Sequence, residues 1–467
     1  MDTKKLRQKI LDLAIHGKLV PQDPNDEPAS VLLERIRKEK EQLIKQGKIK
    51  APKKSKSSSD TSHYQKEGPW ELPEGWCWST LGKVCSKVVD GDHNPPPSER
   101  TPTEYLMISS KNVLDNTLDE LKDVRYLSKP VFEECNKRTS LERGDILLTT
   151  VGTLGRSCIY DGSRKIVLQR SVSVMTPKIS SDYVKCFFDS GYFQRYIENN
   201  ARGTAQKGFY LNLLEATYLP IPPLNEQHLI VNKASSLLSE LNRIEIEKDV
   251  LHNRINKAKN RILDLAIHGK LVPQDPSDEP AIELLKRINP DFKPSDNLHY
   301  VDRLPAGWAE FPLYAICEIL DSRRKPVNSK EREKRVEKTK TLYPYYGATG
   351  QVGLIDNYIL EGDYLLLGED GAPFLDRYAK KAYSVSGKIW VNNHAHILKP
   401  RINPTYMMYY LNAIQYRPYV TGTTRLKLTQ EVMRNIPVLV PPLPEQERII
   451  SRIEKLFRVI DAVQLSK

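Results

Sequence analysis

Apolar residues recur with alternating spacings of four and three along the middle of the chain. They fall at Ile230, Ala234, Leu237, Leu241, Ile244, Leu251, Ile255, Ala258, Ile262 and Leu265. This spacing is typical of the seam of a coiled coil, where one stripe of a long helix packs against another helix. Gly269 can end such a helix because glycine readily adopts a left-handed conformation. The pattern predicts one helix from Glu226 to His268, roughly 65 Å long.

Both ends of the chain carry parts of the same seam. The C-terminal part has Ile449, Ile453, Leu456, Ile460 and Val463, and the N-terminal part has Leu6, Ile10 and Leu13. When the two parts are aligned with the central helix, only positions 249–252 of that helix have no counterpart in either part. We therefore expect the N-terminal helix to continue where the C-terminal helix stops. The chain ends would be adjacent, in a circular arrangement with a pseudo-two-fold axis.

Three sequence motifs occur twice in the same order. Residues 10–36 and 262–288 are identical at 23 of 27 positions. The motif Leu72-Pro-Glu-Gly-Trp76 returns as Leu304-Pro-Ala-Gly-Trp308, and Pro222-Pro-Leu-Asn-Glu-Gln227 returns as Pro441-Pro-Leu-Pro-Glu-Gln446. The chain is therefore two copies of one unit. The segments between the motifs have little in common, which suggests one molecule that recognises two different things.

Turns and linkers follow each copy of the helix end. Asp26 and Asp278 are expected to N-cap a short helix. Residues 39–71 are rich in Lys and Ser and are expected to form a flexible linker, 20 residues longer than its counterpart before Leu304.

Short β-like runs alternate with turns in the segments that differ. The expected strands are 145–149, 165–168 and 172–174 in the first copy, and 363–367 and 388–391 in the second. An aromatic helix is expected near each end, over 183–197 and 404–414. These patterns predict an α+β protein in which two compact α/β domains are separated by two long antiparallel coiled-coil helices. The expected divisions are 1–38, 39–71, 72–222, 223–290, 291–303, 304–440 and 441–467.

Composition narrows the class of protein. The net charge is +12 and the pI is about 9.1, which is typical of a protein with a polyanionic partner such as nucleic acid, although a basic soluble surface alone would also explain it. No apolar run is long enough to span a bilayer, and the chain opens without a signal peptide, so we expect a cytoplasmic protein. The six cysteines lie singly, which favours free thiols over a zinc or disulfide framework.

Three motifs could carry catalysis or a metal ion, and each has a simpler structural explanation. Asn94-Pro-Pro-Pro97 lacks the aromatic residue that an amino-methyltransferase stacks on a flipped base, so a rigid turn is favoured. Glu369, Asp370 and Asp376 with Lys380-Lys381 resemble a magnesium nuclease site, but glycines flank the acids and indicate a structural or base-contacting turn. His394-Ala-His396 lacks an evident third metal ligand.

Basic and polar residues on turn-rich loops are better candidates for contacting DNA. Arg and Lys can bond guanine or phosphate, and Asn and Gln can pair with adenine. The candidates are Lys111, Asn112, Arg156, Gln169, Arg170, Lys207 and Tyr210 in the first copy, and Arg323, Arg324, Lys325, Tyr346, Asn392, Asn393, Arg425 and Lys427 in the second. An ordinary surface position remains an alternative for each.

The order of the repeats resembles the specificity subunit of a type I restriction–modification system. The resemblance covers essentially the whole chain, including the Pro-Pro-Leu-x-Glu-Gln helix start, the repeated Ile-Leu-Asp-Leu-Ala-Ile-His-Gly-Lys-Leu-Val-Pro-Gln, Tyr345-Tyr-Gly-Ala-Thr-Gly350 and Gly422-Thr-Thr-Arg-Leu-Lys427. It implies a non-catalytic DNA reader in which two target-recognition domains each bind one half of a split double-stranded site, at a spacing set by the helices.

The resemblance also implies partners. Two methyltransferase subunits would dock on the repeated scaffold and use S-adenosylmethionine, and restriction subunits would supply ATP-driven translocation with Mg²⁺; this chain itself would bind no cofactor and no metal. Candidate docking residues in the repeat are His16, Lys18, Gln22, His268, Lys270 and Gln274. The two histidines also suit a purely structural role, capping carbonyls at a helix end. Two other hypotheses remain: an enzyme with its own methyltransferase or nuclease site, and a coiled-coil adaptor that ignores nucleic acid.

Overall fold

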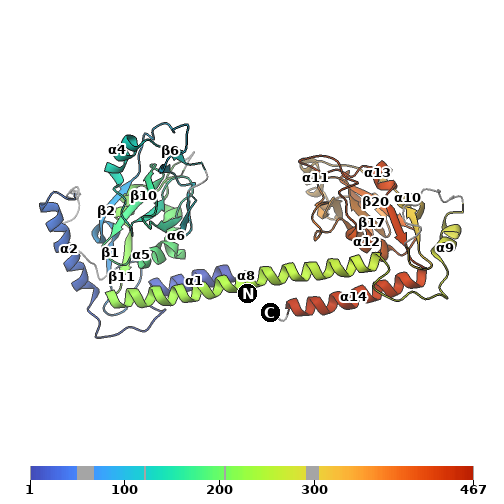
Figure 1. The fold of residues 1–467 in the computed structure, drawn as a ribbon, viewed down its shortest axis with the longest axis horizontal. Helices are drawn as coiled ribbons and strands as arrows, with labels where there is room; N and C mark the ends of the chain where they lie inside the picture. Colours follow the sequence, from blue (N-terminus) through green and yellow to red (C-terminus); the bar gives the residue numbers. More distant parts are fainter. Residues whose placement is uncertain (1, 50–67, 120–122, 204–206, 291–303, 466–467) are drawn as a thin grey trace. The chain divides into compact units, whose positions relative to one another are not determined.

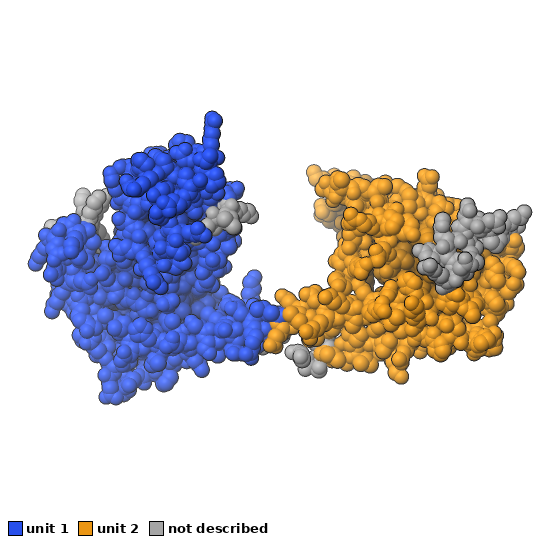
Figure 2. All heavy atoms as spheres, in the orientation of Figure 1, with its two compact units in different colours: residues 1–246 blue, residues 247–467 orange. Residues whose placement is uncertain are grey.

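The structure is a computed structural model that describes residues 2–49, 68–119, 123–203, 207–290 and 304–465. The chain forms two compact units, residues 1–246 and 247–467, which are coloured separately in Figure 2. The division falls inside one long helix, α8 (Leu224–Ile267), so each unit contains one half of it. The helix expected over Glu226–His268 is confirmed to within two residues at each end.

Each half of α8 lies beside an antiparallel helix of its own unit (Figure 1). In unit 1 the partner is α1 (Thr3–Ile15), where Arg7 Nη2 donates to Asn242 Oδ1 at 2.5 Å. In unit 2 the partner is α14 (Leu443–Leu465), where Lys259 Nζ lies 2.6 Å from Asp461 Oδ1. The helical pairs expected from the seam are therefore present within each unit. The expected adjacency of the chain ends concerns the two units together and stays a prediction.

The seam of α8 is buried differently in its two halves. Ile230, Ala234 and Leu241 are buried in the first half, as the spacing predicts. In the second half Ala258 is exposed, and the buried positions near the end are Leu263, Ala266 and Ile267. The stripe shifts because this part of the helix joins the core of unit 2, in the same cluster as the first buried residues of α14.

The two domains have the same sheet order although their sequences differ. In unit 1 the strands β2 (Cys85–Asp90), β10 (Val172–Pro177), β7 (Ile146–Thr149) and β8 (Ser157–Ile159) are neighbours in that order. In unit 2 the order is β13 (Cys317–Ile319), β20 (Ala395–Pro400), β17 (Tyr364–Gly368) and β18 (Ala382–Val385). All neighbouring strands in both sheets are antiparallel. Successive side chains along a strand point to opposite faces of the sheet, so alternate residues face the core.

A second sheet in each domain contains one parallel pair. Unit 1 has β6 (Arg125–Tyr126), β3 (Tyr105–Ile108) and β9 (Lys165–Leu168), with β3 parallel to β9. Unit 2 has β15 (Gly350–Ile355), β14 (Tyr343–Gly347), β19 (Lys388–Val391) and β16 (Leu360–Glu361), with β14 parallel to β19. The first and last strands of each domain close it as pairs, β1 (Cys77–Thr80) with β11 (Tyr218–Ile221) and β12 (Ala309–Pro312) with β21 (Pro437–Val440). A short hairpin joins β4 (Val113–Leu114) to β5 (Thr117–Leu118) in unit 1.

Helices cover the sheets and fill the connections. Unit 1 has α3 (Leu81–Val84), α4 (Lys129–Thr139), α5 (Ser181–Asp189), α6 (Gly191–Asn200) and α7 (Leu211–Glu215). Unit 2 has α10 (Leu313–Ile316), the 3-10 turn η2 (Asp321–Arg323), α11 (Ser329–Val336), α12 (Pro404–Ala413) and α13 (Gln430–Arg434). The α+β class and the five expected strands are confirmed. One continuous aromatic helix over 183–197 is wrong, because Ser190 has extended backbone and its hydroxyl oxygen accepts from Phe193 N, which starts α6 as a separate helix.

The linkers differ from expectation at their starts. Helix α2 (Ala29–Lys45) extends past residue 38, so the linker expected from residue 39 begins later, and its counterpart α9 (Ala281–Ile288) is shorter. Residues 50–67 and 291–303 lie outside the described residues. Asp26 and Asp278 do not cap these helices. They accept bonds instead from Asn225 Nδ2 at 2.8 Å and Arg448 Nη2 at 2.5 Å, at the starts of α8 and α14.

Two expectations from composition can be checked on the structure. All six cysteines are free thiols, as their single spacing predicts. In the part of the chain that the structure describes, no helix combines the length and apolar character that crossing a membrane requires.

Candidate nucleic-acid interface

A matched set of hydrogen bonds, of which the tryptophan bonds are buried, joins each domain to its helices, and we call this set the joint. In unit 1, Trp76 Nε1 donates to Glu226 Oε2 at 2.8 Å and Gln22 Nε2 donates to Glu226 Oε1 at 3.0 Å. In unit 2, Trp308 donates to Glu445 at 3.1 Å and Gln274 donates to Glu445 at 3.1 Å. Burial raises the pKa of both glutamates above its ordinary value, although these bonds oppose the rise. The joint explains why Trp, Glu and Gln recur together in the sequence.

Glycine is required at the turn that leads into each joint. Gly17 and Gly269 have φ of +65° and +64°, a region that other residues adopt only with strain. A Cβ atom at these positions would also lie 2.3 Å from Pro73 Cγ and 2.4 Å from Pro305 Cγ. The repeated His-Gly-Lys sequence is thus the structural signature of a helix that ends against the Leu-Pro-x-Gly-Trp motif.

The candidate docking residues divide into structural and exposed positions. Gln22 and Gln274 belong to the joint and also donate to Gly17 O and Gly269 O, so their amides have structural partners. His16 and His268 place Nδ1 at 2.6 and 2.7 Å from carbonyls one turn earlier, as a helix-end role predicts. His16 also stacks on Trp70, whereas His268 is exposed. Lys18 and Lys270 are exposed at matching positions.

Four loops of unit 1 meet at one edge of the domain, which we call loop edge 1: residues 109–112, 150–156, 169–171 and 207–210. Ser110 N donates to Ser171 Oγ at 3.0 Å, and Thr150 N donates to Ser171 O at 3.0 Å. Gly152 N donates to Lys207 O at 3.2 Å, and Phe209 N donates to Thr150 O at 2.7 Å. Backbone groups and hydroxyls therefore hold this edge together.

The unit 1 candidates from the sequence all lie on loop edge 1, but with different exposure. Lys111, Arg170, Lys207 and Tyr210 are exposed, with Tyr210 at 55%. Arg156 and Gln169 are half-buried. Asn112 is fully buried, because its amide accepts from Ser109 N and donates to Asp119 O at 2.9 Å. In this structure the side chain shapes the loop, and its selection as a DNA-binding residue stays a prediction that its burial disfavours.

The corresponding segments of unit 2 also converge, and we call them loop edge 2: residues 321–325, 369–371, 392–396 and 421–428. Glu369 N donates to His394 O at 2.8 Å, and Leu428 N donates to Glu369 O at 2.7 Å. The second bond matches that from Phe209 to Thr150 in unit 1. The candidates Arg323, Lys325 and Asn393 are exposed on this edge. Tyr346 is half-buried beside Tyr383 at the end of β14, where its carbonyl accepts from Asn392 N.

Charged side chains hold loop edge 2 together. Arg324 bonds Glu369 and lies 3.4 Å from Asp321 Oδ2, and Lys427 Nζ lies 3.2 Å from Glu369 Oε1. Arg425 donates to Asp370 Oδ1 at 3.0 Å, where His394 Nδ1 also lies at 2.5 Å. The side chains of Arg425 and Lys427 are 59% and 51% exposed, so both remain available to a ligand. Arg324 is mostly buried and orients the acids beneath them.

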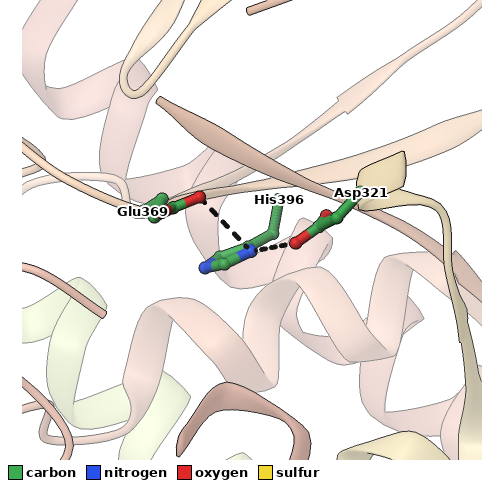
Figure 3. A group of neighbouring side chains, drawn as sticks. All are labelled: Asp321, Glu369 and His396. Carbon is green, nitrogen blue, oxygen red and sulfur yellow. Dashed lines mark hydrogen bonds and ion pairs between the residues drawn. The ribbon is translucent and has the colours of Figure 1, made fainter. Parts of the chain in front are cut away.

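Asp321, Glu369 and His396 come close enough to form a metal site, but their ligand atoms have other partners (Figure 3). His396 is fully buried, with Nδ1 2.6 Å from Asp321 Oδ2 and Nε2 2.9 Å from Leu428 O. Burial disfavours the Asp321 carboxylate, but the bonds from His396 and Ile397 N and the nearby Arg324 outweigh it and lower the pKa of Asp321. Both ring nitrogens of His396 therefore already lie against oxygen atoms of the protein. In this arrangement the three side chains bond one another, Arg324 and the backbone, and the absence of a metal site here stays a prediction.

A hollow of about 650 Å³ lies beside loop edge 2. Its lining includes Asn328, Arg332, Tyr345, Asn393 and His394. The Arg332 guanidinium lies 4.9 Å from the centre of the Tyr345 ring, so a cation and an aromatic ring are in contact in its lining. Among the sequence candidates, Asn392 lines the hollow but is 7% exposed, and its Oδ1 accepts from His394 N at 2.8 Å.

Asn328 and Arg332 were not identified from the sequence as neighbours of the candidates. Arg332 lies in the charged run Ser329–Val336, which has the composition of an ordinary exposed helix. Asn328 is the N-cap of that helix, and its side chain accepts from Glu331 N at 2.9 Å. Only the fold brings α11 next to the turn between β19 and β20, so no local signal could have identified these residues.

Comparisons with known proteins agree with this architecture. The family model described as the type I restriction modification DNA specificity domain matches residues 73–256 and 305–465. The type I restriction enzyme EcoEI specificity subunit of Escherichia coli is 28% identical over 99% of this chain and 90% of its own length. The EcoAI specificity subunit of Escherichia coli is 32% identical over 61% of this chain and 55% of its own length.

A solved structure has a similar fold. It is described as the "structural basis underlying complex assembly and conformational transition of the type I R-M system" and superposes with a TM-score of 0.56 at 17% sequence identity. The match covers 85% of this chain and 94% of that chain. At this identity the likeness concerns the fold alone.

Proposed function

Because the chain belongs to the type I restriction modification DNA specificity family, we propose that it is the DNA-reading subunit of a type I restriction–modification complex. Each domain reads one half of a bipartite double-stranded site through its loop edge. Helix α8, which is continuous and belongs to both units, sets the spacing between the half-sites. The chain contributes recognition, and its partner subunits contribute the chemistry.

The observation that carries this proposal is that the two units have matching joints but different loop edges. The bonds from Trp and Gln to Glu are the same in both units, so both domains are held in the same way on their helices. The loop edges have equivalent backbone bonds but unlike side chains. A scaffold that repeats while its exposed loops differ is what two unlike half-sites require, because base identity is read by side chains.

The basic side chains on the loop edges suit a duplex. Arg170, Lys207, Tyr210, Arg323, Lys325, Asn393, Arg425 and Lys427 are exposed there. Arginine and lysine can bind phosphates or guanine, and asparagine can pair with adenine. We assign Arg425 and Lys427 to direct contact and Arg324 to positioning, since its guanidinium is mostly buried.

Partner docking belongs to the repeated surface. Lys18, Lys270 and His268 are exposed near the joints, and two matching surfaces suit two copies of a methyltransferase subunit. S-adenosylmethionine would act in those subunits, and ATP and Mg²⁺ in restriction subunits, in a cytoplasmic complex. Gln22 and Gln274 hold this surface in shape.

A domain exchange tests the proposal. Residues 304–440 are replaced by the matching segment of another family member, and the complex is expressed in a host whose methylated motif is sequenced. We expect one half of the motif to change while the other half and the spacing stay the same. The reciprocal exchange of residues 72–222 is the matched control and should change only the other half.

Two results would contradict the proposal. An unchanged motif after both exchanges would show that the domains do not read sequence. Methylation or cleavage of DNA by the purified chain alone, supplied with Mg²⁺ and S-adenosylmethionine, would show that the chain is an enzyme in its own right.

A further inference from the structure

A second hollow in unit 2 lies between the last turns of α8 and two segments of the domain. Its volume is about 500 Å³, and its walls come from residues 257–264, 374–381 and 412–417. Asn260 Nδ2 donates to Arg377 O at 2.8 Å, which fastens the first segment to the helix. Asn412 Oδ1 accepts from Lys381 N at 2.7 Å, which fastens the two segments to each other. The hollow is therefore a fixed feature of the fold, and we call it the basic groove.

Positive charge dominates the basic groove. Five cationic side chains and one carboxylate line it: Lys257, Arg261, Arg377, Lys381, Arg417 and Asp264. The carboxylate is paired with Arg261 at 2.8 Å. Lys257, Arg377 and Arg417 are exposed, and none has a carboxylate within 4.0 Å among the residues that the structure describes. Because cations outnumber carboxylates in its lining, the groove favours an anionic occupant.

A buried cation forms the floor of the groove. The side chain of Lys381 is 1% exposed, and its ammonium donates to Asp376 O at 2.5 Å. Burial lowers the pKa of this lysine, which the nearby Asp376 carboxylate opposes. An ammonium group has three donors, so this one backbone carbonyl leaves capacity for an oxygen of a ligand. The same loop exposes Leu375 at 50% and Tyr378 at 45% beside these cations.

The groove is continuous in the chain with loop edge 2. Residues 374–381, which form one wall, follow shortly after Glu369 and Asp370 in the chain. Residues 412–417, which form another wall, precede Arg425 and Lys427. The isolated bridge between Asp370 and Lys427 joins both segments at the loop edge. A single polyanion that contacts the loop edge can thus follow the same two segments into the groove.

We propose that the basic groove holds the sugar–phosphate backbone of duplex DNA beside the half-site that unit 2 reads. This inference rests on the proposed function, which supplies the duplex. Lys257, Arg377 and Arg417 contact phosphates, and Lys381 fixes the floor. The groove adds affinity without reading sequence, because phosphates are the same at every base pair.

In the described part of unit 1 the matching face of α1 is covered, although α1 repeats the helix residues. Lys5, Gln8, Lys9 and Asp12 occupy the positions that correspond to Lys257, Asn260, Arg261 and Asp264. Helix α6 covers that face of α1, since a Cβ atom on Gly191 would come within 2.9 Å of Gln8 Oε1. The connection between β7 and β8 is also too short to form a second wall. Backbone contacts of this kind should therefore occur on one side of the bipartite site only.

The test measures DNA binding by the full chain assembled with its methyltransferase subunits. The double variant Arg377→Ala/Arg417→Ala is compared with Arg452→Ala/Lys455→Ala, which removes two exposed charges from α14 outside the groove. Two duplexes are titrated over a range of salt concentrations, one with the methylated motif and one of unrelated sequence. We expect the groove variant to bind both duplexes about 5- to 20-fold more weakly, and its salt slope to fall by about 0.9 per lost phosphate contact. The control variant should match the wild-type protein.

Other outcomes show whether the groove proposal or the proposed function is wrong. The groove proposal is overturned if the groove variant binds both duplexes as tightly as the wild-type protein does. In that case the proposed function still stands, provided that the wild-type assembly prefers the duplex with the motif. Loss of the methyltransferase subunits on gel filtration, with DNA binding of the remaining complex unchanged, would make the groove a protein-docking surface and also overturns it. Failure of the wild-type assembly to prefer its motif would contradict the proposed function instead. Circular dichroism of each variant checks that the fold is retained.

Discussion

In unit 1 backbone groups and hydroxyls hold the loop edge together, whereas in unit 2 charged side chains add to the backbone bonds. Ser110, Thr150 and Ser171 make the linking bonds in unit 1. Arg324, Glu369 and Lys427 make them in unit 2, with Asp370, Arg425 and two histidines around them. Both sets are arranged on the same sheet order. The fold therefore constrains where the loops meet but not which chemistry holds them.

The joints show the opposite behaviour, because they agree bond for bond between the units. The indole, the carboxylate and the amide occupy the same positions in both. A buried polar group without a partner costs free energy, so changing one member alone is penalised. An exposed loop carries no such constraint. The comparison teaches that coupled buried bonds preserve a repeat, while exposed loops are able to diverge on the same backbone.

The largest expected effect comes from removing the indole of either joint. Trp76→Ala and Trp308→Ala each delete a buried ring together with its bond to a glutamate. We expect each variant to lose about 3–5 kcal/mol in the free energy of unfolding of its own unit. Hydrogen exchange followed separately in residues 72–222 and 304–440 measures this loss. Trp76→Phe and Trp308→Phe, which keep a ring and lose the hydrogen bond, should lose less. A large loss in one unit and none in the other would break the equivalence of the joints.

A smaller effect distinguishes the two loop edges. Arg324→Ala leaves Glu369 and the buried Asp321 without their guanidinium, so we expect a loss of about 3 kcal/mol in the free energy of unfolding of unit 2. Arg170→Ala removes an exposed arginine from loop edge 1 and should change stability by less than about 0.5 kcal/mol. Chemical denaturation of each variant gives both values. Arg324→Lys keeps the charge and should recover part of the loss. Equal losses at Arg170 and Arg324 would show that the two edges are held in the same way.

The features that sequence predicts well are those with short periods or exact repeats. The seam spacing predicts α8, and the two matched motifs predict the joints' position, because both signals lie in contiguous sequence. The strands at Lys165–Leu168 and Lys388–Val391 were predicted to the residue. The break at Ser190 was missed, because one serine in an aromatic run gives no sign that its hydroxyl will start a new helix.

The side chains at the loop edges were predicted by type but not by exposure. Asn112 and Asn392 have the right chemistry for adenine, yet both are turned inward to bond neighbouring backbone groups. Arg324 is also mostly buried, because it bonds Glu369, which follows β17, as well as Asp321 three residues before it. Arg332 reaches the hollow beside Tyr345 only through the placement of α11. Such contacts depend on segments far apart in sequence, so local patterns do not contain them.

The smallest expected effect is the pH dependence that Asp321 gives to unit 2. The pKa of Asp321 is lowered in the folded protein, because its bonds to His396 and Ile397 N and the nearby Arg324 outweigh burial. A carboxyl group with a lowered folded pKa stabilises the protein above its unfolded pKa of about 3.9, and that stabilisation is lost as the pH falls through the folded value. Asp321→Asn keeps the shape and can donate to His396 Nδ1 while Nε2 still donates to Leu428 O.

We therefore expect Asp321→Asn to lower the free energy of unfolding of unit 2 by about 1–2 kcal/mol at pH 7. The difference from the wild-type protein should shrink as the pH is lowered below about 4. Hydrogen exchange in residues 304–440 across this pH range measures it, and residues 72–222 serve as the internal control because loop edge 1 is held by hydroxyl and backbone groups. A difference that stays constant with pH, or that also appears in unit 1, would show that the Asp321 carboxylate does not stabilise loop edge 2 as an ion. A difference confined to unit 2 would establish that the two edges achieve the same backbone arrangement by different chemistry.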